Sequence, residues 1–137
     1  MNTAVTVDAS VVVNAFNPTE KGSERSWRFL AELREKALPL IVPTLLLVEV
    51  VATLARKQNN TELALDWLYE FTRYPHVTWI NLDENLAALA AEIAARHRLR
   101  SSDAVYVAVA RRFATPLVTL DAEQLERAQA VVTVRKP

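Results

Sequence analysis

The sequence has 137 residues, of which 51% are hydrophobic, so it is long enough and apolar enough for one domain with a buried core. The 16 Lys and Arg residues balance the 16 Asp and Glu residues. This balance argues against nucleic-acid binding through bulk charge, although it leaves room for an acidic site beside a local basic patch. Cysteine is absent and Gly22 is the only glycine. Disulfides, thiolate chemistry and glycine-rich phosphate loops are therefore excluded.

The sequence contains no apolar run of the roughly 18 residues that a membrane helix needs. The first residues lead directly into a strand-like segment and lack the basic and apolar regions of a secretory signal. We therefore expect a cytoplasmic protein.

The hydrophobic pattern predicts strands that alternate with helices along the chain. The predicted strands are 3–7, 40–42, 77–82, 117–120 and 131–134, and the predicted helices are 10–16, 23–36, 44–57, 61–74, 86–97, 101–113 and 122–130. Such alternation is typical of a parallel sheet covered by helices on both faces. Without repeats or linkers, residues 1–137 are predicted to form a single α/β domain.

Two aspartates lie at the ends of predicted strands. Asp8 follows the first strand and Asp121 follows the fourth. Ligands of open parallel sheets bind at the carboxyl ends of the strands, so both residues are candidates for a functional site. Each aspartate could instead be a helix N-cap, and one residue can serve both purposes.

Glu49 stands in the apolar segment Leu45-Leu46-Leu47-Val48-Glu49-Val50-Val51. A lone buried carboxylate is costly, and no cationic residue lies three or four positions away on the same helix. We expect a cation from elsewhere in the fold, although Glu49 could also emerge at the surface of an otherwise buried helix.

Asp103 opens a predicted helix within Ser101-Ser102-Asp103-Ala104, where the helix dipole favours a carboxylate in its ionised form. Three nearby arginines, Arg96, Arg98 and Arg100, are candidates for binding RNA phosphates. The alternative for Asp103 is ordinary first-turn chemistry, and for the arginines it is favourable placement at a helix C-terminus.

An oxygen-only set of carboxylates suits Mg²⁺ or Mn²⁺ better than Zn²⁺. Such an ion can activate water and stabilise charge on a phosphodiester. Trp27, Trp67 and Trp79 are predicted to belong to the core rather than to a base-stacking surface. The helices at 23–36 and 61–74 nevertheless carry bulky apolar residues around much of their circumference, so they are candidates for partner contact.

Four short motifs resemble the PIN domain, and specifically the VapC-type toxin nucleases of toxin–antitoxin pairs. The motifs are Val7-Asp8-Ala9-Ser10-Val11, Pro43 leading into the helix with Glu49, Ser102-Asp103-Ala104-Val105-Tyr106, and Val118-Thr119-Leu120-Asp121. They occur in the family's order and span essentially the whole chain.

The resemblance implies a five-stranded parallel sheet and an endoribonuclease that cleaves structured RNA such as tRNA or rRNA with Mg²⁺ or Mn²⁺. It also implies a homodimer and a cognate antitoxin whose C-terminal segment covers the site. By this resemblance Asp8, Glu49, Asp103 and Asp121 are the catalytic, metal-binding acids, with Ser10 and Thr119 as supporting residues. Glu123 could share or replace the role of Asp121.

Two other functions fit the sequence less well. A phosphatase with an aspartate nucleophile would normally show a second Asp two residues after Asp8, where this chain has Ser10. A catalytically inactive PIN-like domain could bind only RNA or a partner protein, but such a domain would have no use for a full set of clustered carboxylates.

Overall fold

The computed structural model describes residues 3–137 and shows strands alternating with helices, as predicted. The strands are β1 (Thr6–Val7), β2 (Leu40–Pro43), β3 (Val77–Ile80), β4 (Leu117–Val118) and β5 (Val134–Arg135). The helices are α1 (Ala9–Ala15), α2 (Ser23–Glu35), α3 (Leu45–Gln58), α4 (Thr61–Phe71), α5 (Glu84–His97), α6 (Ser101–Phe113), α7 (Ala122–Arg127) and the 3₁₀ helix η1 (Ala128–Ala130). The last strand, predicted at 131–134, begins later in the structure, at Val134. The backbone N–H groups of Val131 and Val132 still donate to Ala128, so the strand forms only at Val134.

The strands form two parallel sheets rather than the single five-stranded sheet that was predicted. One sheet has three strands in the order β1-β4-β5, and the other pairs β2 with β3. A single parallel bridge between Val5 and Leu40 connects them. Near this bridge Val5 N donates to Pro39 O at 3.0 Å and Ile41 N donates to Val5 O at 2.9 Å. Backbone pairing between the two sheets is limited to this short stretch, so a continuous ladder does not form.

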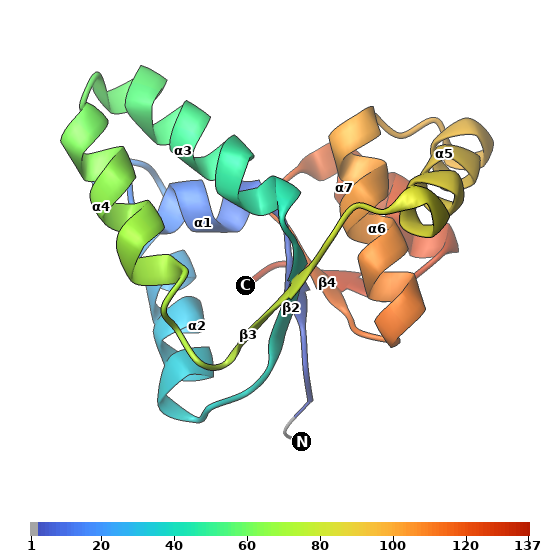
Figure 1. Ribbon diagram of the computed structural model, residues 1–137, viewed down its shortest axis with the longest axis horizontal. Helices are drawn as coiled ribbons and strands as arrows, with labels where there is room; N and C mark the ends of the chain where they lie inside the picture. Colours follow the sequence, from blue (N-terminus) through green and yellow to red (C-terminus); the bar gives the residue numbers. More distant parts are fainter. Residues whose placement is uncertain (1–2) are drawn as a thin grey trace.

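Helices cover both faces of the strands (Figure 1). Helices α1 to α4 lie on one side, and α5, α6 and α7 lie on the other. The best-buried helix is α6, in which every residue from Asp103 to Ala110 is buried. Within residues 3–137, no helix combines the length and the hydrophobicity required to cross a membrane.

The tryptophans divide between core and surface. Trp67 is 4% exposed and stacks on Phe71, with ring centroids 4.8 Å apart, so it belongs to the core as predicted. Trp27 is 51% exposed and makes only an edge contact with Phe16, so its assignment to the core is wrong. Trp79 is half-buried against Phe71. Trp67 is correspondingly removed from the candidates for partner contact, whereas Trp27 remains.

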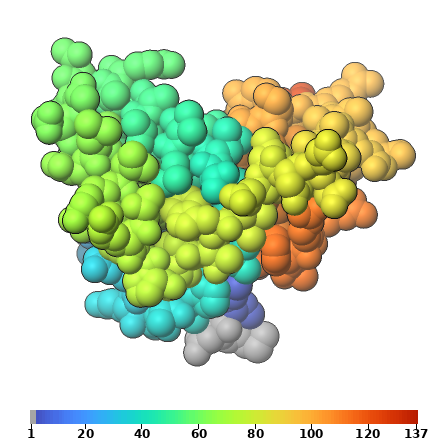
Figure 2. Space-filling model, viewed as in Figure 1, coloured from blue at the N-terminus to red at the C-terminus, as the bar shows by residue number. Residues whose placement is uncertain are grey.

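The carboxyl ends of β1 and β2 point toward the same edge of the molecule (Figure 1). On the molecular surface this edge is hollowed between α3 on one side and α5 with α6 on the other (Figure 2). The fold therefore brings residues that follow different strands to one indented edge, where parallel sheets usually bind ligands.

Candidate functional site

Asp8 is the most enclosed acidic residue at this edge. It follows β1, caps α1, and is only 3% exposed. Its Oδ1 accepts hydrogen bonds from the backbone N–H of Ser10 at 3.1 Å and from the Ser10 hydroxyl at 2.5 Å. Its Oδ2 accepts from the Thr119 hydroxyl at 2.5 Å and from Gln124 Nε2 at 2.7 Å. All four donors are neutral, so the carboxylate is well bonded but carries an unbalanced charge.

That environment changes the acidity of Asp8. Burial raises its pKa from 3.8 to about 6, which outweighs the lowering by the hydrogen bonds from Ser10 and Thr119. The negative charge of Asp103 raises the pKa further. Asp8 and Asp103 are thus close enough to interact electrostatically.

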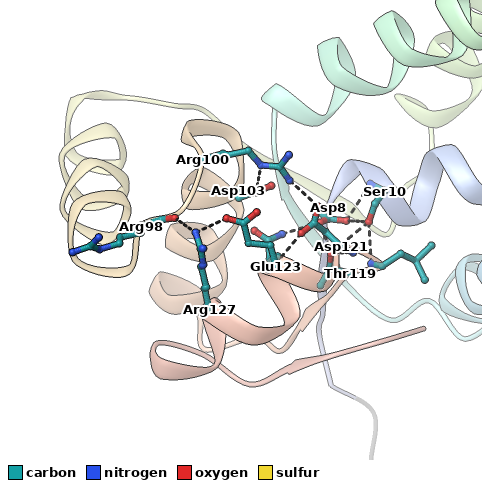
Figure 3. Close-up of polar contacts among 11 residues, drawn as sticks. Asp8, Ser10, Arg98, Arg100, Asp103, Thr119, Asp121, Glu123 and Arg127 are labelled. Carbon is teal, nitrogen blue, oxygen red and sulfur yellow. Dashed lines mark hydrogen bonds and ion pairs between the residues drawn. The ribbon is translucent and has the colours of Figure 1, made fainter.

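Asp121 is linked to Asp8 through a short polar network (Figure 3). The hydroxyl of Thr119 donates to Asp8 and accepts from the backbone N–H of Asp121 at 3.0 Å. Asp121 also caps α7, because its Oδ1 accepts from the backbone N–H of Gln124 at 2.9 Å. Gln124 therefore contacts both aspartates, one through its backbone and the other through its side chain. Asp121 is therefore both the N-cap of α7 and a residue at the carboxyl edge of the strands.

Asp103 lies in the first turn of α6 and is 8% exposed. Its Oδ2 accepts from Arg100 Nε at 3.0 Å, and the same guanidinium donates from Nη2 to Asp121 Oδ2 at 2.7 Å (Figure 3). Burial raises the pKa of Asp103, while Arg100 opposes that rise. One arginine thus bridges two of the predicted metal ligands.

Glu49 is half-buried on α3 and finds a neutral partner rather than the cation that was expected. The hydroxyl of Tyr106, a residue of α6 that is 1% exposed, donates to Glu49 Oε1 at 2.6 Å. Burial and the neighbouring Glu49 charge raise the pKa of Tyr106, so its phenol stays protonated and remains a donor. The charges of Asp8 and Asp103 add to this effect, which places Tyr106 among three of the four predicted acids.

The remaining residues predicted to serve the site, Glu123, Arg96 and Arg98, make their contacts at the protein surface. Glu123 pairs with Arg127, whose Nη1 also donates to the carbonyl of Arg98 at 2.6 Å. Arg96 pairs with Glu92 on the exposed face of α5 at 3.0 Å. Arg98 ends α5 in the left-handed region, with φ at 53°, and its side chain extends away from the aspartates (Figure 3).

The donor chemistry fits a hard divalent cation. Asp8, Asp103 and Asp121 supply only oxygen, and Gln124 Oε1 is a buried acceptor for which no hydrogen-bond partner lies within the described chain. Within residues 3–137, however, no three acidic or histidine side chains are arranged to hold one ion together. The four-carboxylate metal centre therefore remains a prediction. Arg100 connects Asp103 with Asp121, and Thr119 connects Asp121 with Asp8.

Sequence reasoning missed two contributors to this edge. Gln124 is 0% exposed and holds Asp8, and the only signal for it was its position three residues after Asp121. Tyr106 stood out in the sequence only as part of the motif around Asp103, whereas in the structure its hydroxyl holds Glu49. Neither contact joins residues that are close in sequence, so a local pattern could not reveal them.

A second feature is an apolar cavity of about 410 Å³ on the side of the molecule formed by α2 and the end of α4. Its lining includes Phe16, Trp27, Leu30, Phe71, Tyr74 and His76. Arg34 closes one side, where its guanidinium lies 4.3 Å from the centroid of the Tyr74 ring.

Comparison with known proteins gives one family and a set of similar structures. The model of the PIN domain matches residues 5–130. VapC20 of Mycobacterium tuberculosis, described as a toxin that cleaves the sarcin–ricin loop, shares 19% identity with a TM-score of 0.79 over 97% of this chain and 99% of its own. FitAcB of Neisseria gonorrhoeae shares 22% identity with a TM-score of 0.71 over 97% of each chain. VapBC2 of Rickettsia felis, solved on a DNA fragment from its promoter, shares 13% identity with a TM-score of 0.73 over 98% of this chain and 99% of that one. A search of curated protein sequences gives no significant match.

The raised pKa of Asp8 predicts how its neutralisation affects stability. The pKa of about 6 in the folded protein exceeds 3.8, the ordinary value for aspartate, so protonated Asp8 favours folding. This contribution to stability is fully present below about pH 3.8 and is lost as the pH rises through 6. Asn keeps the cap and removes the charge. In EDTA at pH 8, Asp8→Asn is expected to be more stable than the parent by about 1–3 kcal/mol in urea unfolding, with the difference shrinking toward pH 4. Asp83→Asn, at the exposed cap of α5, is the control and should show no such gain. A loss of stability in Asp8→Asn at both pH values would contradict the prediction.

The hydrogen bond from Gln124 to Asp8 is tested by a double-mutant cycle. Gln124→Leu keeps most of the side-chain volume but removes the donor, so it should lower the free energy of unfolding at pH 8 by about 1–3 kcal/mol. In the Asp8→Asn background the loss should be about 1 kcal/mol smaller, because an Asn that keeps the cap presents Nδ2, which cannot accept the hydrogen bond from Gln124 Nε2. Equal losses in the two backgrounds would show that Gln124 acts by packing alone.

Proposed function

Because the chain belongs to the PIN-domain family, we propose that it is a divalent-metal-dependent endoribonuclease that acts as the toxin of a VapC-type toxin–antitoxin pair. The observation that carries this proposal is the position of Asp8, Asp103 and Asp121. Asp8 precedes the other two aspartates by more than 90 positions in the sequence, yet all three meet in one polar network at the carboxyl edge of the parallel strands.

In the proposed site Asp8, Glu49, Asp103 and Asp121 hold Mg²⁺ or Mn²⁺. A bound ion of this kind supplies positive charge that stabilises the phosphodiester as it is cleaved. Ser10, Thr119 and Gln124 act indirectly, because their hydrogen bonds fix both oxygens of Asp8. Tyr106 fixes Glu49 in the same way.

We propose structured RNA, such as tRNA or rRNA, as the substrate. The description of the Mycobacterium tuberculosis neighbour as a sarcin–ricin loop cleaving toxin supports this class of substrate. Arg96, Arg98 and Arg100 lie between the last turn of α5 and the start of α6, the helix that carries Asp103, and Arg100 contacts Asp103 and Asp121 directly. Their proposed role is to bind RNA phosphates beside the site, where basic side chains position the nucleic acid.

The proposed partner is an antitoxin, which is supported by a similar structure described as a toxin–antitoxin complex from Klebsiella pneumoniae. The apolar cavity between α2 and α4 is our candidate for its docking site, because it combines exposed Trp27 with a deeper apolar wall. We also propose a homodimer. Val48 on α3 is 67% exposed and Leu82, which precedes α5, is 45% exposed, so these apolar side chains are candidates for contact with a second copy.

The nuclease proposal is tested by incubating purified protein with tRNA and rRNA in Mg²⁺, in Mn²⁺ and in EDTA. Cleavage is expected only with metal, and Asp103→Asn should lower its rate by about 100-fold or more, because a ligand charge is lost. Asp66→Asn makes the same substitution on α4 and should cleave like the parent. Cleavage that persists in EDTA would contradict metal dependence. RNA binding without cleavage under every condition would favour the inactive, RNA-binding alternative.

The docking proposal is tested with the product of the short open reading frame that adjoins the toxin gene. Trp27→Ala should weaken its binding about 30-fold, corresponding to a buried aromatic anchor of about 2 kcal/mol. Tyr69→Ala is the matched control, because Tyr69 is a similarly exposed aromatic residue, at 55%, outside the cavity lining. Equal affinity of Trp27→Ala and the parent, measured by calorimetry, would exclude this cavity as the docking site.

A further inference from the structure

Arg100 holds an unusual position at the acidic edge, because one guanidinium bridges two carboxylates from different parts of the fold. Its Nε donates to Asp103 Oδ2 at 3.0 Å and its Nη2 donates to Asp121 Oδ2 at 2.7 Å. Asp103 belongs to α6, while Asp121 follows β4 and caps α7. The planar guanidinium suits such two-sided pairing (Figure 3).

Within the part of the chain that the structure describes, Arg100 is the only cation paired with the predicted metal ligands. Asp8 receives only neutral donors, and the partner of Glu49 is a phenol. Arg100 is thus the single positive charge paired with the four predicted metal ligands among the described residues. The buried Oε1 of Gln124, whose side chain also holds Asp8, is a further acceptor with no partner among the described residues. This edge accordingly offers more oxygen acceptors than Arg100 can satisfy.

The three side chains differ in how freely they can move. The side chain of Arg100 is 61% exposed, whereas those of Asp103 and Asp121 are 11% and 27% exposed. Arg100 can swing into solvent without disturbing the core, and exposed ion pairs of this kind are weak. The carboxylates are held in place by α6 and by the cap of α7, so they remain when the guanidinium leaves.

We propose that Arg100 is a built-in counter-ion that competes with a divalent cation for Asp103 and Asp121. In the metal-free protein it neutralises these two carboxylates, and a bound ion displaces it. This inference rests on the proposed metal-dependent function. It accounts for the arrangement within residues 3–137, where no three acids surround one position while Arg100 occupies the edge.

The competition is measured by titrating purified parent, Arg100→Ala, Arg100→Lys and Arg28→Ala with Mn²⁺ in a calorimeter. Removing two weak ion pairs from the metal-free state predicts that Arg100→Ala binds Mn²⁺ about threefold to tenfold more tightly than the parent. Arg100→Lys keeps the charge but loses the planar bridge, so its affinity should fall between the two. Arg28→Ala removes the same charge from an exposed pair with Glu24 on α2 and should match the parent.

A second readout follows Arg100 directly. The Nε–H resonance of Arg100 in the NMR spectrum, assigned with Arg100→Lys, should be protected from solvent exchange in EDTA and lose that protection when Mg²⁺ is added. Equal Mn²⁺ affinity in the parent and Arg100→Ala, or protection that persists at saturating Mg²⁺, would overturn the competition and leave the proposed function intact. Absence of Mn²⁺ binding in both proteins would overturn the competition together with the metal-dependent function.

Discussion

The carboxylate of Asp8 is the group around which the candidate site is organised. It lies at the end of β1, yet its hydrogen-bond partners come from α1, from the residue after β4 and from α7. Two of these partners are 111 and 116 positions away in the sequence. Burying an ionised group is costly unless its oxygens are bonded, so the fold must bring both ends of the chain together before Asp8 is satisfied. The parallel pairing of β1 with β4 makes this possible.

The same contacts connect the acids to the packed core. Thr119 and Gln124 are both fully buried, and α6, which carries Asp103 and Tyr106, is buried from Asp103 to Ala110. Side chains held by such a helix have little freedom to adjust. These buried contacts hold the acids in place, whereas the side chain of Arg100 is 61% exposed and is the least enclosed member of the group.

Local patterns in the sequence were sufficient to find most helices and the acids at the strand ends, because periodicity and capping act over a few residues. Other features depend on distant neighbours. The phenol that holds Glu49 is 57 positions away, and the arginine that bridges Asp103 reaches Asp121 across 21 positions. Trp27 and Trp67 lie on similar stripes, but only Trp67 is covered by the tertiary packing. The limited pairing of β1 with β2 is likewise a property of the assembled sheet.

The zero net charge of the chain conceals a local imbalance. Many surface carboxylates are matched by a basic residue four positions away, as in the pairs of Glu24 with Arg28 and Glu32 with Lys36. The acidic edge has only Arg100, and Asp8 has no basic partner among the described residues. Residues that lower the stability of a fold in this way are typical of binding sites, because the ligand supplies what the folded chain lacks. Here the missing component is positive charge, and the oxygen donors around it suit a divalent ion. The electrostatic cost of the metal-free edge and its proposed affinity for metal thus arise from the same arrangement of carboxylates.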